Sequence, residues 1–182
     1  MSKMFNPNAE LLQFIGFGEE EQKEKRGTYV LMQIPTRPDD YGEYGYVHAM
    51  IVNASFDQFR EILFKEDYIK EKWAQITCGH IFGEMIYNAA FHGNKCDPAK
   101  KIDIGVWFGS RGMLFGVRDE GSFFRSPKVK KMVEKLEDIP SSTGSASRGD
   151  GMDQIQEADK VFVSNEENTL YAAVLLSSLE KE

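Results

Sequence analysis

The sequence is poor in cysteine and in positive charge, and each shortage excludes a class of protein. Its two cysteines, Cys78 and Cys96, share no metal-type spacing and fit the thiols of a reducing compartment. Because 22 basic residues face 29 acidic ones, the net charge is −7 at pH 7, and no basic stripe exists to displace counterions from a phosphate backbone. We therefore expect no nucleic-acid partner.

Long hydrophobic runs are also missing. Residues 1–26 lack a basic segment followed by an apolar run and a small-residue cleavage site, and no later stretch reaches a membrane-spanning length. The sequence therefore predicts a cytoplasmic protein that does not associate with a membrane.

What is present is enough for one folded core. The chain has 182 residues, of which 41% are hydrophobic and 12% aromatic, and we expect a single domain. Residues 1–26 are predicted to be an irregular or partly helical lead-in, and helical spacing is found at residues 56–64 and 69–92. Strand patterns occupy residues 28–34, 101–108, 113–118, 160–163 and 169–176; GSRG joins the second to the third, as in a tight hairpin.

The long helical segment carries the first candidate site. Its centre, ITCGHIFGEMIYNAAF, is apolar nearly all round, so we expect it to be buried on several sides. Glu84 and Asn88 lie four residues apart and project from one face, where a magnesium ion with its waters would satisfy them. The alternative is a pair hydrogen-bonded to neighbouring loops. A zinc-protease motif would need a second histidine after His80, so we expect His80 to be a packed or hydrogen-bonded core residue.

The end of the predicted hairpin carries the second candidate. Asp119 would present a fixed carboxylate, and Gly121, which has no side chain, would let a planar base approach the backbone. This combination is suited to recognition of the adenine amino group. The alternative is an ordinary turn aspartate, because the same spacing recurs at Asp40 and Gly42 without comparable context.

The third candidate follows a flexible segment. Residues 127–138 have a lysine- and glutamate-rich helical pattern, and SSTGSASRGDG comes after them, so residues 122–148 are predicted to form a lid. Gly149 and Gly151 precede MDQI and would offer backbone N–H groups to a polyphosphate, although a plain turn is the alternative. Arg148 would balance charge on the γ-phosphate or be a solvated loop charge. The lid lysines, Lys131 among them, are predicted to lie on an exposed helix face.

In this order the motifs resemble those of the histidine-kinase-like ATPases, and most closely the anti-sigma-factor serine kinases. EMIYNAAFHGN resembles the asparagine box, in which Glu84 would be the general base and Asn88 the magnesium ligand. DEGSFF resembles the adenine motif, SRGDGMDQI resembles the second glycine motif, and ENTLY includes a threonine that supports the adenine contact. The matching residues are Asp119, Gly121, Phe124, Gly149, Gly151, Met152 and Thr169.

The resemblance implies a fold, ligands and partners. The fold would be an α/β two-layer sandwich with a mixed, mainly antiparallel sheet covered on one face by helices, the Bergerat ATP-binding fold. Residues 1–27 would be an N-terminal extension and residues 28–182 the ATP-binding domain. The ligands would be ATP and Mg²⁺, the partner an anti-sigma-antagonist-like or sigma-factor-like protein, and a homodimer is allowed. Two departures are Asp150 inside the glycine motif and a longer stretch than usual between Pro38 and Glu84.

Several functions remain open at this point. The implied function is that of a serine/threonine kinase regulating a protein partner. The alternatives are a stand-alone ATPase, a nucleotide-binding regulatory module without turnover, and an α/β protein whose motifs have only structural roles. A sensor histidine kinase is disfavoured, because none of the three histidines lies in a separate dimerising helical hairpin.

Overall fold

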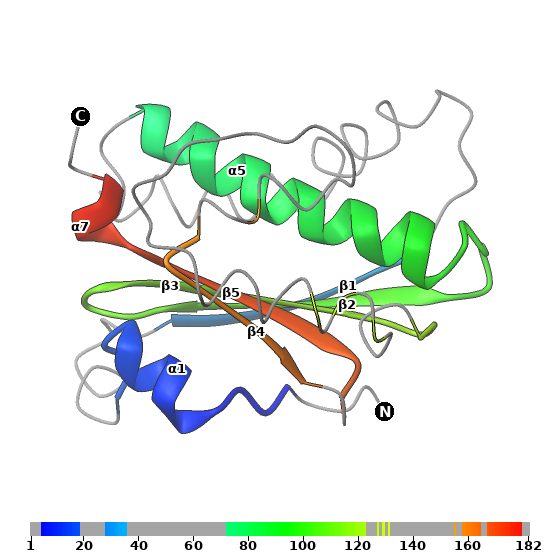
Figure 1. The fold of residues 1–182 in the computed structure, drawn as a ribbon, viewed down its shortest axis with the longest axis horizontal. Helices are drawn as coiled ribbons and strands as arrows, with labels where there is room; N and C mark the ends of the chain where they lie inside the picture. The colour runs from blue at the N-terminus through cyan, green and yellow to red at the C-terminus, as the bar shows by residue number, and fades with distance from the viewer. Residues whose placement is uncertain are drawn as a thin grey trace.

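A computed structural model shows how the chain folds (Figure 1). It describes residues 5–18, 28–35, 72–122, 127, 129, 131, 155, 158–164 and 167–179. The predicted helix at residues 56–64 therefore lies outside the described residues, as does nearly all of the predicted lid. Among the described residues, each helix is too short or too polar to cross a lipid bilayer.

The centre of the fold is a five-stranded sheet in the order β1-β2-β3-β5-β4. Every neighbouring pair in this sheet is antiparallel. The sequence-based expectation of an α/β fold with a mainly antiparallel sheet is confirmed to this extent. The strands are β1 (Thr28–Pro35), β2 (Lys101–Phe108), β3 (Gly112–Asp119), β4 (Lys160–Ser164) and β5 (Thr169–Leu175).

The predicted hairpin forms strands β2 and β3. The Gly109 N–H donates to the Gly112 carbonyl over 2.9 Å and closes the turn. Both strands are buried along most of their length, because apolar side chains point alternately to the two faces and both faces are covered. The last strand is shorter than predicted, since β5 ends at Leu175 and a helical turn, α7 (Leu176–Leu179), follows it.

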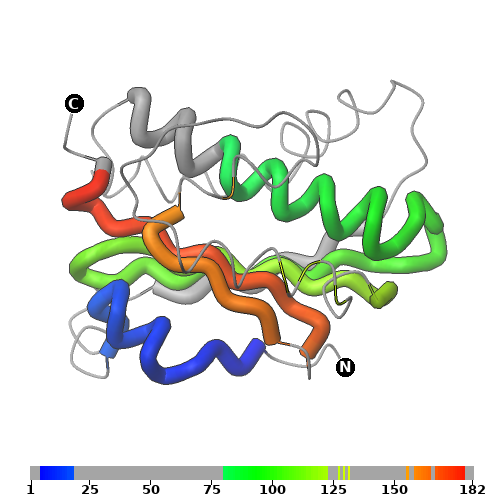
Figure 2. The backbone as a smooth tube through the Cα atoms, viewed as in Figure 1, coloured from blue at the N-terminus to red at the C-terminus, as the bar shows by residue number. Residues whose placement is uncertain are grey.

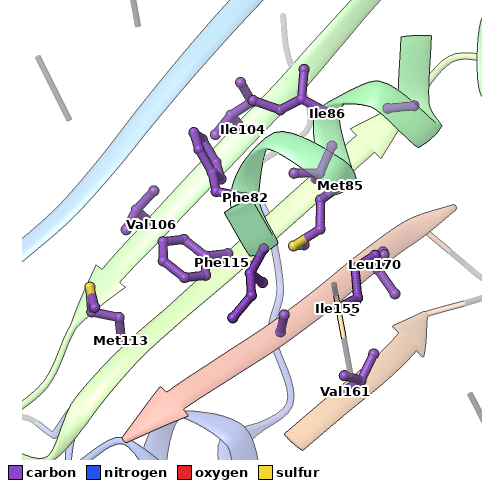
Figure 3. Close-up of a cluster of buried hydrophobic side chains, with 14 of the residues drawn as sticks. Phe82, Met85, Ile86, Ile104, Val106, Met113, Phe115, Ile155, Val161 and Leu170 are labelled. Atoms are coloured by element: carbon purple, nitrogen blue, oxygen red, sulfur yellow. The ribbon is translucent and has the colours of Figure 1, made fainter. Parts of the chain in front are cut away.

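One face of the sheet is covered by helix α5 (Lys72–Tyr87), which continues as a π-helical segment, η2 (Asn88–Gly93). Phe82, Met85 and Ile86 point from α5 onto β2 and β3, and the ring centroids of Phe82 and Phe115 are 5.4 Å apart (Figure 3). The buried arc does not extend around the whole helix. His80 is exposed, so the prediction that it is a core residue is wrong: it projects to the side away from the sheet.

The opposite face carries a second apolar cluster, which was not predicted. Helix α1 (Ala9–Phe14) begins at Asn8, whose Oδ1 accepts from the Glu10 N–H over 2.6 Å. The N-terminal segment runs beneath β4 and β5 (Figure 2). Helices therefore lie on both faces rather than on one. The members of this second cluster are Phe5, Leu11, Ile15, Trp107, Leu114, Tyr171 and Ala173.

Polar contacts hold the N-terminal segment in place. The N–H groups of Ser110 and Arg111 donate to the carbonyls of Gly16 and Ile15 over 3.1 and 2.9 Å. Lys160 Nζ lies 2.5 Å from Glu10 Oε1, and this hydrogen bond, together with the lysine charge, holds the pKa of Glu10 below its ordinary value. The lead-in is thus bonded both to the β2–β3 turn and to β4.

Truncating a buried residue of α1 tests whether this segment belongs to the cooperative core. Leu11 is 1% exposed, so Leu11→Ala should lower the free energy of unfolding by about 2–5 kcal/mol in urea titration. The control is Gln13→Ala on the exposed side of the same helix, which should change it by less than about 0.5 kcal/mol. Equal stability of the two variants would contradict the packing of α1 on the sheet.

Candidate functional site

The end of the long helix meets the end of strand β3. A side chain on Gly93 would overlap the carboxyl group of Asp119, and one on Gly121 would overlap the Gly93 carbonyl. The two glycines therefore allow the helix end to lie directly on the Asp119–Gly121 backbone. The close approach expected of a base at Gly121 is here made by the protein's own backbone, which is an additional reason for glycine at this position.

Asn94 ties this junction together. Its Nδ2 donates to the Lys101 carbonyl over 2.9 Å, and its Oδ1 accepts from the Glu120 N–H over 2.8 Å. Glu120 Oε2 in turn accepts from the Lys101 N–H over 2.7 Å. Because Asn94 is fully buried, it fixes the start of β2 and the end of β3 against the last turn of the helix.

Asp119 is 4% exposed, and its carboxyl group accepts two hydrogen bonds. Its Oδ1 accepts from the Gly121 N–H over 2.6 Å and from Asn168 Nδ2 over 2.8 Å. The first bond is the local Asx turn expected of an Asp-x-Gly sequence. The second comes from the β4–β5 turn and was missed by sequence reasoning, although an asparagine between two short strands is a turn signal.

Thr169 is placed differently from the expectation. It pairs with Arg118 on β3, whose guanidinium lies over the Phe5 ring on the α1 side of the sheet. Since side chains alternate along a strand, Thr169 shares that face, and Asp119 points to the opposite one. Thr169 Oγ1 donates to the Glu167 carbonyl over 3.2 Å. Among the described residues of this turn, Asn168 is the one that reaches Asp119.

Glu84 and Asn88 interact with each other. Asn88 Nδ2 donates to the Glu84 carbonyl over 2.9 Å and to Glu84 Oε1 over 3.2 Å. Asn88 is fully buried, whereas Glu84 lies at the edge of the buried arc of the helix. The amide nitrogen faces Glu84, so the carboxamide oxygen, the atom suited to a magnesium ion, is turned away from it.

The π-helical segment begins at Asn88. The Asn94 N–H donates to the Ala89 carbonyl over 2.8 Å, a bond five residues back along the chain. Such wide turns are rare and are frequent at functional sites. This segment joins the Glu84–Asn88 pair to Gly93, and so to Asp119, within about two helical turns.

The structure therefore connects four of the predicted site residues through one helix and one strand end: Glu84, Asn88, Asp119 and Gly121. Thr169 lies on the neighbouring strand, on the other face. The remaining predicted site residues lie outside the described residues: Phe124, Arg148, Gly149, Gly151 and Met152.

Comparison with known proteins adds no further assignment. No protein-family model matches the chain, and a search of the curated proteins finds no match. Any function is therefore argued from the residues and their geometry.

Asn94 offers a test of the junction. Asn94 is fully buried, and Asn94→Ala removes both of its side-chain hydrogen bonds, to the Lys101 carbonyl and from the Glu120 N–H, so unfolding should become easier by about 1–3 kcal/mol. Asn94→Asp retains an acceptor for the Glu120 N–H but places a charged oxygen against the Lys101 carbonyl, so it should be destabilised at least as much as Asn94→Ala. A junction that does not depend on Asn94 would leave both variants as stable as the wild type.

Proposed function

We propose that this protein binds Mg-ATP through a Bergerat-type site and acts as a serine/threonine kinase of the anti-sigma-factor type on a protein partner. The observation that carries the proposal is the contact of Gly93 with Asp119 and Gly121, because it joins the helix of Glu84 and Asn88 to the Asp-x-Gly strand end. An antiparallel sheet with α5 packed along one face supports the same proposal.

Asp119 is the proposed acceptor for the adenine amino group. Its carboxyl is oriented by the Gly121 N–H and by Asn168, so little side-chain freedom is left to lose on binding. A fixed carboxylate accepts hydrogen bonds from an amino group and repels a carbonyl oxygen at the same place. This chemistry suits adenine.

Asn88 and Glu84 are proposed for the phosphate end. The carboxamide oxygen of Asn88 is a hard ligand of the kind magnesium accepts, and the Asn88 Nδ2 bond to Glu84 keeps that oxygen turned away from the glutamate. When bound, magnesium would neutralise charge that develops on the phosphates. Glu84 would accept the proton of the attacking hydroxyl, and Arg148, Gly149 and Gly151 are proposed to contact the phosphates.

The hydrogen bond between Glu84 and Asn88 is also compatible with a second function. Its Oε1 accepts from Asn88, so in this arrangement the carboxylate helps to hold the ligand residue. A nucleotide-binding module without turnover would need only that role, whereas a kinase or a stand-alone ATPase would need Glu84 as a base.

Nucleotide binding is tested by calorimetric titration with ADP and a non-hydrolysable ATP analogue, with and without magnesium. Asp119→Asn removes the carboxylate charge at nearly constant volume and should weaken ADP binding about 10- to 100-fold. The neighbouring Glu120→Gln keeps an oxygen for the Lys101 N–H and should bind as the wild type does. Absence of nucleotide binding in the wild type would end the proposal.

Turnover is tested separately. Glu84→Ala should lower magnesium-dependent ATP hydrolysis or transfer to a protein serine by about 10²- to 10⁴-fold, because a general base is lost. Nucleotide affinity of the variant, measured by the same titration, should stay within a few-fold of the wild type. If the wild type binds ATP but never turns it over with any partner, the protein is a nucleotide-binding module and the kinase proposal is rejected.

A further inference from the structure

Asn168 occupies a position in the β4–β5 turn that few residues adopt. Its φ of 53° lies in the left-handed region, which asparagine tolerates better than most side chains. It is 2% exposed and immediately precedes β5. A turn residue held in this conformation and almost fully buried is well suited to a role beyond connecting two strands.

The amide nitrogen of Asn168 is fully engaged by the Asp119–Gly121 segment. Nδ2 lies 2.9 Å from the Asp119 carbonyl, 2.8 Å from Asp119 Oδ1 and 3.2 Å from the Gly121 carbonyl. All three atoms are acceptors, so only the NH₂ end of the carboxamide can face them. The orientation of the side chain follows from these contacts.

The carboxamide oxygen of Asn168 takes no part in these contacts. Among the residues that the structure describes, Asn168 Oδ1 is buried and has no hydrogen-bond partner. A buried acceptor without a donor costs about 1–3 kcal/mol. Support of Asp119 explains the nitrogen of this side chain but not its oxygen, for which the described residues supply no donor.

We infer that Asn168 Oδ1 is a second acceptor for the exocyclic amino group of the purine, beside Asp119, and that the pair selects adenine over guanine. The inference rests on the proposed function. Oδ1 belongs to the same carboxamide group as Nδ2, which donates to Asp119 Oδ1, so the unpaired oxygen lies in the junction that holds the carboxyl proposed to bind the base. Adenine presents an amino donor at its six position, whereas guanine presents a carbonyl oxygen that would face two acceptors.

The test compares ADP with purine riboside diphosphate, which lacks the amino group, and with GDP, by calorimetric titration. Wild type should prefer ADP to both. Asn168→Gly suits the left-handed backbone and should reduce the preference for ADP over the amino-free nucleotide about 3- to 10-fold, both alone and in an Asp119→Asn background, where no carboxylate is left for Asn168 to orient. Ser164→Ala removes a hydroxyl contact to the Glu167 N–H in the same turn, away from Asp119, and should leave the preference unchanged.

The outcomes distinguish failure of the proposed nucleotide binding from failure of the role inferred for Asn168. If wild type binds none of the three nucleotides, the proposed function fails and this inference with it. If wild type binds ADP but Asn168→Gly weakens ADP and the amino-free nucleotide equally, Asn168 only positions the turn and the inference alone is overturned.

A measurement on the wild type covers the case in which Asn168→Gly does not fold. The side-chain amide resonances of Asn168 should shift on saturation with ADP and shift much less with purine riboside diphosphate. Equal shifts with the two nucleotides would overturn the inference, because the amino group would then make no contact with this side chain.

Discussion

The structure depends on the contact between the end of the long helix and the end of strand β3. At this point the Asp119 carboxyl packs against Gly93 and accepts hydrogen bonds from the Gly121 N–H and from Asn168 Nδ2. Burial of a carboxyl group is unfavourable without hydrogen-bond donors, so the Gly121 N–H and the Asn168 amide, which both donate to Asp119 Oδ1, are a condition of the arrangement. Three segments far apart in sequence, the helix, the hairpin and the β4–β5 turn, are brought together by this one side chain.

The local elements were predictable because their patterns are local. The hairpin has alternating apolar residues on either side of GSRG, and the helical spacing around Phe82, Met85 and Ile86 is repeated at three and four residues. These signals do not depend on distant partners, and the structure has a hairpin and a helix at these places. The exposed position of His80 was not predicted, because an apolar sequence does not show which side of a helix lacks a covering layer.

The features that the sequence did not indicate depend on pairing between distant segments. The side of the sheet occupied by Thr169 is decided by its register with Arg118, and a shift of one residue would have exchanged its place with that of Asn168. Packing of α1 under the sheet likewise needs Trp107 and Tyr171 from strands far along the chain. Motifs could therefore indicate the carboxyl and amide groups of a site, but not which turn residue completes it.

The aromatic cluster under the sheet has a consequence for shortened forms of the chain. Trp107, Leu114 and Tyr171 form a continuous apolar surface that the N-terminal segment covers, and Phe5 lies edge-on to the Trp107 ring at 5.7 Å between centroids. A chain starting at β1 would present this surface to water. Contiguous apolar surface of this kind promotes self-association, so such a fragment would be difficult to keep monomeric in solution.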